Sequence, residues 1–388
     1  MATETDAPTA PAPAPRRRRL VRRLVAAVVA LAVLAVAAVA GVGWYFSGVA
    51  TEVEHGREYD LTILDAGNGT VTLPRDPGTL RPGVWGLEWS GGRAILGQVT
   101  AATATTVTRR IDRAVQGTPV KGTRAVIDHW VYAGDPKTAL GLEFEQVTYP
   151  SKLGPMPAWL LPGAGLNRPW VIAVHGHNAD RAETFRAMRA VQRTGLPMLS
   201  IAYRNDTGAP ASPDGRNNLG HTEWNEVASA IAYARSRGAT SVILYGWSMG
   251  GAMVMRTLRA VPEGVQGVVL DSPVMDWGAT LDKQGADRGL PSPVTWAAKQ
   301  ILQLRTGIDL KDFDQRRYAA RLKVPVLMYT VTEDEMVDNA PSEEFARRAP
   351  RGLVTHVSMK SDHTDGWNVD PRGYEAALDT FLRKTARP

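Results

Sequence analysis

The residues with the clearest chemical potential lie in the pentapeptide Gly246-Trp247-Ser248-Met249-Gly250. Residues 241–245 before it are mostly β-branched and aromatic, as in a buried strand, and residues 251–260 after it follow a helical pattern. A G-x-S-x-G sequence between a strand and a helix predicts a sharp turn that exposes the serine hydroxyl, because the glycines leave it room. Ser248 is therefore the candidate nucleophile, and the amide of Met249 is a candidate oxyanion donor.

A nucleophilic serine needs a base and an acid that orients the base. The apolar strand pattern over residues 326–330 runs into a loop that contains four acids. We predict that Asp334 is the orienting acid, because it lies about four residues beyond the carboxyl end of this strand. Glu333, Glu335 and Asp338 are the alternatives, and each is otherwise a solvated carboxylate on an exposed loop.

Histidine is the expected base, because its pKa lies near neutral pH. Two histidines follow Asp334 in the chain. His356 lies within the apolar strand pattern of residues 354–359, which predicts a packed side chain. His363 lies in the polar loop after that strand, where a base can approach Ser248, and we predict that His363 is the base.

The oxyanion hole requires backbone amides that point at the developing negative charge. An early apolar strand pattern, residues 170–174, is followed by His175-Gly176-His177-Asn178. We expect the amide of His177 or Asn178 to be the second donor, beside that of Met249. His175 and His177 lie on a loop without further ligands, which argues against a metal pair. No pattern in the chain demands a metal or an organic cofactor.

The elements that position these residues alternate between strands and helices from residue 145 onward. The strand patterns cover residues 145–149, 158–161, 170–174, 198–203, 241–245, 267–270, 324–330 and 354–359. Alternation of this kind predicts a mostly parallel sheet with helices on both faces. Helical sequence in residues 274–320 interrupts the alternation and predicts a cap over the pocket. Residues 50–144 contain short strand patterns between turn residues, and they predict a small β-rich region.

Four of these motifs, in this order, resemble the α/β-hydrolase superfamily: residues 171–176, residues 246–250, residues 332–337 and His363. The resemblance covers about residues 145–385 and is closest to membrane-anchored actinobacterial proteins of the serine aminopeptidase-like and dienelactone-hydrolase-like branch. It implies an α/β fold, specifically an α/β-hydrolase fold, and hydrolysis of an ester, thioester or amide through an acyl-enzyme. The family's usual His-Gly-x-x-Asp is replaced here by residues 330–334, Thr-Val-Thr-Glu-Asp, so the acid rests on weaker evidence than the serine.

The N-terminus has the composition of a membrane anchor. Residues 24–46 carry no charge and end in three aromatic residues, which suits a transmembrane helix with its aromatic end at the far interface. Residues 1–23 hold six arginines, so we expect them to form a disordered, basic, cytoplasmic tail and the domain of residues 145–388 to lie outside. A cleaved signal peptide is the alternative, because residues 38–40 (Ala-Val-Ala) fit a cleavage site.

Composition narrows the remaining choices. The chain has no cysteine, which excludes disulfides, thiolate metal sites and a cysteine nucleophile. Four of its six net positive charges lie in residues 1–23, so no basic face for a nucleic acid is expected. The expected partner is a small-molecule, peptide or lipid acyl substrate, and the oligomeric state stays open. A peptidase, an acyltransferase and a non-catalytic envelope binding module are the alternative functions.

Overall fold

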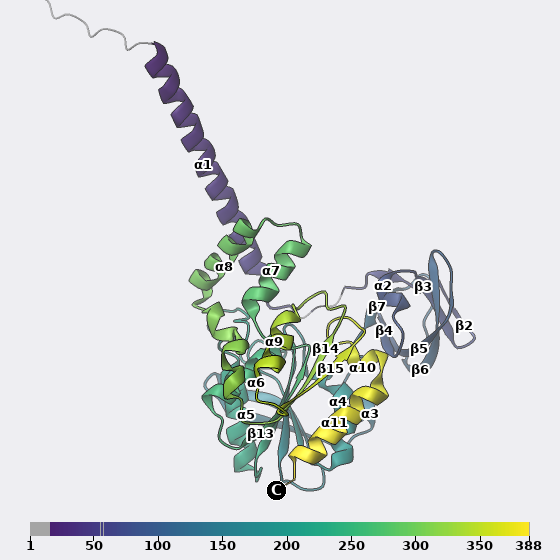
Figure 1. Ribbon diagram of the computed structural model, residues 1–388. Coiled ribbons are helices and arrows are strands. Elements are labelled where there is room, and N and C mark those ends of the chain that lie inside the picture. The colour runs from purple at the N-terminus through teal and green to yellow at the C-terminus, as the bar shows by residue number, and fades with distance from the viewer. Residues whose placement is uncertain (1–15, 55, 57, 388) are drawn as a thin grey trace, which may run out of the picture.

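The computed structural model describes residues 16–54, 56 and 58–387. Figure 1 shows three parts: a long helix that leaves the body as a rod, a small β domain at one side, and a large domain with a central sheet. The rod is α1 (Arg16–Val49), and its large apolar side chains between Leu20 and Val36 are exposed. This helix is long and apolar enough to cross a membrane.

The helix differs from the expected anchor at both ends. Residues 16–23 were expected in a disordered tail, but they are helical, because arginine is a good helix former and continues the apolar helix backwards. The rest of that tail, residues 1–15, lies outside the described residues. At the other end the helix continues beyond Phe46 to Val49, where it reaches the body.

The β domain is a seven-stranded antiparallel sheet in the order β1-β7-β4-β5-β6-β3-β2. Its elements are β1 (Leu61–Thr62), β2 (Asp65–Gly67), β3 (Thr70–Pro74), α2 (Pro77–Leu80), β4 (Trp85–Trp89), β5 (Gly92–Ala102), β6 (Thr106–Gln116) and β7 (Arg124–Asp128). The buried guanidinium of Arg109 on β6 donates to the carbonyls of residues 79, 81, 83 and 97. Arg109 therefore fixes the loop of residues 79–83 to the sheet.

The large domain has an eight-stranded sheet in the order β15-β14-β13-β12-β10-β11-β9-β8. Its strands are β8 (Glu145–Ser151), β9 (Gly154–Leu161), β10 (Trp170–Val174), β11 (Met198–Ile201), β12 (Val242–Trp247), β13 (Val265–Asp271), β14 (Val326–Val331) and β15 (Val354–Met359). Strand β9 pairs antiparallel with both β11 and β8, and β10 to β15 are parallel. Parallel strands place their carboxyl ends at one edge, where a ligand site forms.

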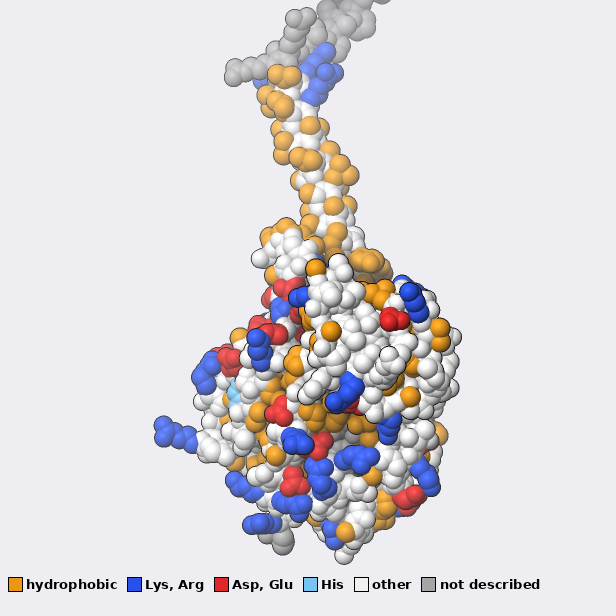
Figure 2. Space-filling model, turned by 90° about the vertical axis from the view of Figure 1, so that its right-hand side faces the viewer, with side chains coloured by type: hydrophobic (Ala, Val, Ile, Leu, Met, Phe, Trp, Pro, Cys, Tyr) orange, Lys and Arg blue, Asp and Glu red, His pale blue; other side chains and the backbone are white. Residues whose placement is uncertain are grey.

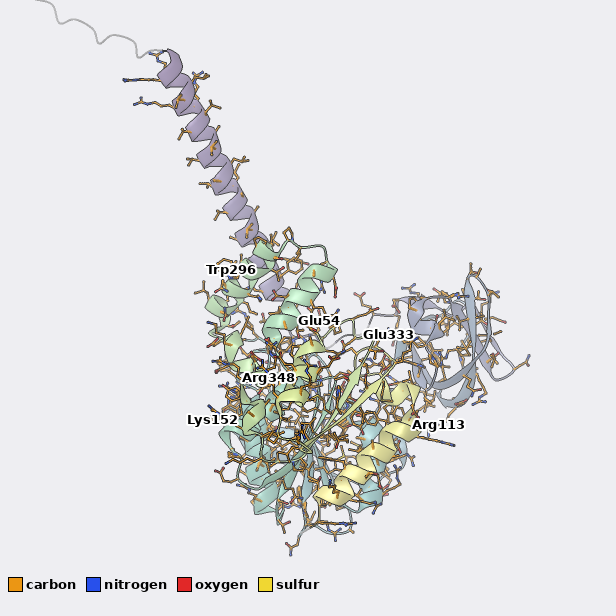
Figure 3. All side chains as sticks on the ribbon, in the orientation of Figure 1. Glu54, Arg113, Lys152, Trp296, Glu333 and Arg348 are labelled. Carbon is orange, nitrogen blue, oxygen red and sulfur yellow. The ribbon has the colours of Figure 1, made fainter. Side chains whose placement is uncertain are left out.

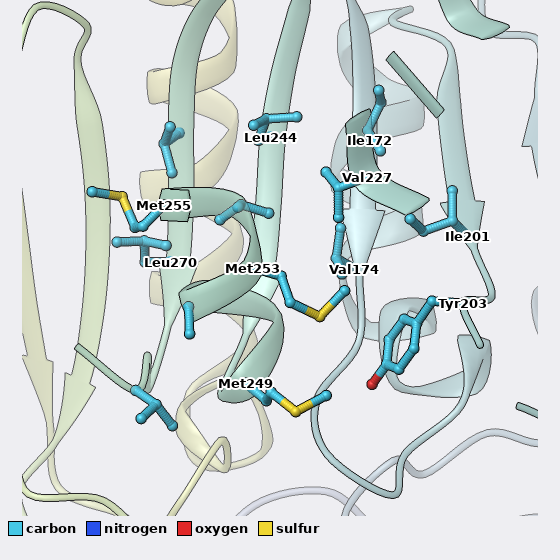
Figure 4. Close-up of a cluster of buried hydrophobic side chains, with 14 of the residues drawn as sticks. Ile172, Val174, Ile201, Tyr203, Val227, Leu244, Met249, Met253, Met255 and Leu270 are labelled. Carbon is cyan, nitrogen blue, oxygen red and sulfur yellow. The ribbon is translucent and has the colours of Figure 1, made fainter. Parts of the chain in front are cut away.

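Helices cover both faces of this sheet and build two cores. The helices are α3 (Pro136–Leu140), α4 (Phe185–Thr194), α5 (Trp224–Ser236), α6 (Met249–Ala260), α9 (Ala340–Arg348), α10 (Gly366–Val369) and α11 (Pro371–Thr385), with a 3-10 turn η1 (Arg181–Thr184) before α4. Figure 4 shows Met253 of α6 beside Val174 and Met255 of the same helix beside Leu270, within one buried cluster. Helices α4 and α11 bury their apolar side chains on the opposite face.

The segment between β13 and β14 forms the cap. It consists of α7 (Trp277–Asp287), α8 (Ser292–Thr306), and the 3-10 turns η2 (Leu310–Phe313) and η3 (Gln315–Arg321). These elements coincide with the helical insertion that the sequence predicts over residues 274–320, except that η3 ends one residue later, at Arg321. In Figure 1 the cap lies at the end of the body that α1 joins.

One histidine, His356, differs from what its sequence pattern predicts. His356 was expected to be packed, but its side chain is exposed, and its Nε2 lies 2.8 Å from Thr330 Oγ1. The reason is position in the sheet: β15 is an edge strand, so parts of both faces meet solvent.

Candidate active site

Ser248 lies at a strained corner between β12 and α6. Its φ is +49°, in the left-handed region that side chains rarely adopt, and its side chain is half-buried. The flanking glycines make the corner possible. A Cβ on Gly246 would lie 2.4 Å from the Gly250 carbonyl oxygen, and one on Gly250 would lie 2.2 Å from the Val174 oxygen. The corner therefore exposes the hydroxyl at the carboxyl edge of the sheet.

The structure brings the three predicted site residues together. His363 Nε2 lies 2.9 Å from Ser248 Oγ, and His363 Nδ1 lies 2.9 Å from Asp334 Oδ2. His363 lies in the loop between β15 and α10, and Asp334 lies in the loop after β14. Three loops at the same sheet edge thus bring the candidate nucleophile, base and acid into hydrogen-bond contact.

Asp334 is the loop acid whose surroundings suit an orienting role. Its Oδ1 accepts hydrogen bonds from the amides of Met336 (2.9 Å) and Val337 (2.7 Å), which leaves Oδ2 for His363. The carboxylate is buried, whereas the side chains of Glu333 and Glu335 are exposed. The acid is thus held by two amides and points at the imidazole.

The environment of His363 moves its pKa in two opposing directions. Burial lowers the pKa of His363, but the hydrogen bond and the negative charge of Asp334 raise it, and Glu183 and Asp271 add to the increase. The net result is a pKa above the ordinary value of histidine. Neutral imidazole, the form that can accept the proton of Ser248, therefore becomes dominant at a higher pH than for a free histidine.

The predicted oxyanion loop, residues 175–178, lies directly against Ser248. A Cβ on Gly176 would lie 3.1 Å from Ser248 Cβ. The Gly176 amide donates to Glu183 Oε2 (2.7 Å), so it points away from the substrate position. Among the described residues no acceptor pairs with the amide of His177, which comes next in the chain. The Met249 amide begins α6, where a helix has no carbonyl of its own to bond.

Buried contacts of His175 and Tyr203 stabilise this loop. His175 is fully buried, stacks on Tyr203 at 4.3 Å, and its Nε2 lies 2.7 Å from Asp206 Oδ2. Burial lowers the pKa of His175, but Asp206 outweighs this and the pKa is raised. The Tyr203 hydroxyl donates to the Gly176 carbonyl at 2.6 Å. The His-Gly pair thus fixes the backbone of the loop.

A cavity of about 280 Å³ lies beside Ser248. Most of its lining is apolar and comes from the cap helices α7 and α8, from the loop residues Met336 and Val337, and from the end of α1. Phe46 and Val49 are among the α1 residues that line it. The sequence predicts the cap over the pocket, but it gave no indication that the end of α1 lines the pocket as well.

The β domain contacts the histidine loop through Arg81, a contact that the sequence did not reveal. Arg81 donates to Asp362 Oδ2 (2.6 Å) and to Asp365 Oδ2 (3.0 Å), on either side of His363. The Asn368 side chain donates to the carbonyls of Val84 and of residue 129, each at 2.8 Å. The aspartates on both sides of His363 were the only visible signal, since paired acids attract a cation.

The segment after α1 contacts the oxyanion loop, which the sequence also did not reveal. Asn178 Nδ2 donates to the Glu52 carbonyl (3.2 Å), and the Glu54 amide donates to Asn178 Oδ1 (3.3 Å). The His177 ring hydrogen-bonds the backbone of Ala50. Two of the loop residues predicted as oxyanion donors therefore carry side chains that bind residues 50–54.

Comparison with known proteins bears on the family and the fold of the chain. A family model described as "Alpha/beta hydrolase family" matches residues 160–380, and a model for a domain of unknown function matches residues 62–128. No curated protein matches significantly.

Solved structures share the fold at low sequence identity. The esterase Pf2001 of Pyrococcus furiosus is 18% identical, with a TM-score of 0.54 over 66% of this chain and 97% of that one. A complex of DcsB with its substrate analogue is 17% identical, with a TM-score of 0.50 over 63% of this chain and all of that one. The family model alone covers more than half of the chain. The chain therefore belongs to the alpha/beta hydrolase family.

Proposed function

We propose that this chain is a serine hydrolase that cleaves a carboxylic ester through an acyl-enzyme. The observation that carries the proposal is the continuous series of hydrogen bonds from Ser248 Oγ through His363 to Asp334. The Pyrococcus furiosus protein of similar fold is described as an esterase, so an ester is the substrate class to test first.

In the proposed reaction His363 Nε2 takes the proton of Ser248 as Oγ attacks the ester carbonyl carbon. The amides of Met249 and His177 bind the oxyanion, and the carboxylate of Asp334 stabilises the imidazolium. Collapse of this intermediate breaks the bond to the alcohol, which leaves with the proton of His363. Water then attacks the acyl-enzyme with His363 as base, and the acid and Ser248 are released.

We also propose that α1 anchors the enzyme in a membrane with the catalytic domain outside the cytoplasm. The described arginines, residues 16–19, 22 and 23, lie at the end of α1 remote from the body. Basic residues are retained on the cytoplasmic side, so the opposite end and the domain beyond it would be translocated. Figure 2 shows the apolar rod between this basic end and the body.

One experiment tests both the chemistry and the location. Intact cells expressing the full chain are given a charged, membrane-impermeant short-chain ester and a fluorophosphonate probe. We expect the wild type to hydrolyse the ester and to be labelled by the probe. In Ser248→Ala the labelling should disappear, and kcat for the ester should fall by a factor of about 10³ or more. Ser241→Ala, just before the strand β12 that leads to Ser248, is the matched control and should behave as the wild type.

The outcomes separate the competing assignments. Labelling that persists in Ser248→Ala would reject the nucleophile, and hydrolysis that requires cell lysis would reject the outer location. Turnover of aminoacyl amides in preference to esters would indicate a peptidase. Transfer of the acyl group to an added alcohol in preference to water would indicate an acyltransferase.

A further inference from the structure

The last turns of α1 do not stand free of the body, unlike the rest of that helix. Residues 39, 42, 43, 46, 47 and 48 of the helix and residue 50 just after it are buried or half-buried, whereas residues 40, 41, 44, 45 and 49 are exposed. This spacing of three and four residues defines one helical face. That face packs on α8, so α1 is a structural part of the cap over its final turns.

Small residues permit the close packing of α1 on α8. A Cβ on Gly43 would lie 2.6 Å from Ile301 Cδ1 and 3.1 Å from Ala298 Cα, so the two backbones approach closely. Ser47 and Thr51 continue the same face at intervals of four residues and are buried. Small residues with this spacing are typical of helix pairs in membranes. Arg305 fixes the pair from the α8 side, because it stacks on Trp44 at 4.0 Å and donates to Ser47 Oγ.

The position of this contact along α1 places the cap at the membrane surface. A bilayer core is about 30 Å thick and needs about 20 helical residues at 1.5 Å each. The uncharged residues from Leu24 supply this length by Gly43, which packs closely on α8. Two large apolar side chains of α8 are also exposed, Trp296 by 62% and Leu304 by 85%. Figure 3 places Trp296 at the end of the body beside α1.

The same turns of α1 form a wall of the cavity beside Ser248. Phe46 and Val49, with Ala50 just after the helix, line it opposite residues of α7 and α8. Val49 is 44% exposed, which puts it at the rim, while Leu302 on α8 is buried within. The cavity therefore extends from the serine to the place where the anchor leaves the body, between surfaces that are mainly apolar.

We propose that the end of α1 is part of the substrate site, and that the cavity takes the acyl chain of a membrane-borne ester directly from the bilayer. This inference rests on the proposed hydrolase function. A water-soluble substrate has no need for an apolar cavity that opens beside the anchor, whereas an acyl chain would pass from lipid to protein without crossing water. The anchor then fixes both the place of the enzyme and the entry of its substrate.

Two glycines of α1 provide a matched pair of variants. Gly43→Leu forces α1 away from α8, whereas Gly41→Leu adds the same side chain where nothing lies within 4 Å. Full-length protein in phosphatidylcholine vesicles is assayed with p-nitrophenyl palmitate in the bilayer and with p-nitrophenyl acetate in water. We expect Gly43→Leu to lower the ratio of palmitate to acetate turnover by at least tenfold, and Gly41→Leu to leave both rates unchanged.

A second arrangement tests the route of entry. Wild-type protein in one population of vesicles is mixed with palmitate ester carried in the same vesicles or in separate ones. We expect the ester in the same vesicles to be cleaved at least tenfold faster. Equal rates of cleavage in the two arrangements would overturn the inference. An equal loss of palmitate and acetate turnover in Gly43→Leu would also overturn it, because a general structural defect lowers both turnovers alike.

Failure of this inference can be told apart from failure of the proposed function. A wild type that cleaves acetate but shows no chain-length effect in Gly43→Leu contradicts the substrate site alone. A wild type that cleaves neither ester contradicts the hydrolase. In that case the binding of a fluorescent long-chain fatty acid is measured. Weaker binding by Gly43→Leu than by Gly41→Leu supports the cavity, and equal binding rejects it.

Discussion

The segment after α1, residues 50–54, and the β domain both hold loops of the candidate site, but they use different interactions. The β domain holds the histidine loop with charge, because Arg81 bridges two aspartates around His363. Residues 50–54 hold the oxyanion loop with neutral contacts, in which backbone groups pair with the side chains of His177 and Asn178. The comparison predicts that damage to the β domain alters proton transfer, while damage to residues 50–54 alters transition-state binding without changing the pH profile.

The largest effect is expected from Gly83→Ala in the β domain. Gly83 has a φ of +95°, and a Cβ there would lie 2.0 Å from the carbonyl oxygen of Asn368, in the helix just after His363. The clash is with backbone, so the β domain or the histidine loop must move. A displacement of about 1 Å can cost about 10²-fold in turnover, and we expect a loss of this order in kcat for a short-chain ester.

Gly91→Ala is the matched control for this variant. Gly91 has a φ of +85° in the same domain, but a Cβ there would meet nothing within 4 Å. It carries the strain of an alanine at positive φ, about 1 kcal/mol of unfolding free energy, without the clash. Its kcat should stay near that of the wild type. Equal losses of kcat in the two variants would show that the β domain does not position His363.

The variant Arg81→Met tests whether the charge of Arg81 affects His363. Without the guanidinium, Asp362 and Asp365 are left uncompensated beside His363, and they stabilise the imidazolium. The pKa of His363 should rise further, so the acid limb of kcat/KM should move to higher pH, because only neutral imidazole can accept the serine proton. We expect a loss of about tenfold near neutral pH, where one unit of pKa is equivalent to tenfold.

Two further variants make the Arg81 result specific. Arg81→Lys should recover part of the activity and of the pH profile, since lysine keeps the charge but not the two-pronged geometry. Arg110→Met removes a guanidinium that pairs with Asp112 on the exposed part of the same sheet, and it should change neither. An unchanged acid limb in Arg81→Met would reject the electrostatic role.

The two regions also differ in how far they could be predicted. Ser248, Asp334 and His363 each follow a strand pattern directly, and parallel strands bring their carboxyl ends to one edge, so local sequence is enough to place them together. Arg81 contacts Asp362 across 281 residues, and no local pattern records such a contact. The contact between the end of α1 and α8 is harder still to predict, because the apolar residues that suit a bilayer also suit packing on another helix. Gly43 and Ser47 carry the only sign of that contact, and small residues are common in any membrane helix.

The smallest effect is expected where the contacts are neutral, in Asn178→Gly. Glycine keeps the φ of +51° and removes the hydrogen bonds to residues 52 and 54, together with the one that Asn178 Oδ1 accepts from Asn217 Nδ2 (2.9 Å), each of which contributes about 1 kcal/mol or less. The oxyanion loop should become less ordered, and kcat should fall about fivefold while the acid limb of kcat/KM stays in place. Asn68→Gly is the control, because Asn68 has a φ of +50° in a turn of the β domain remote from these contacts. A shift of the acid limb in Asn178→Gly, or a loss larger than that of Arg81→Met, would show that the two regions do not divide the site as their contacts indicate.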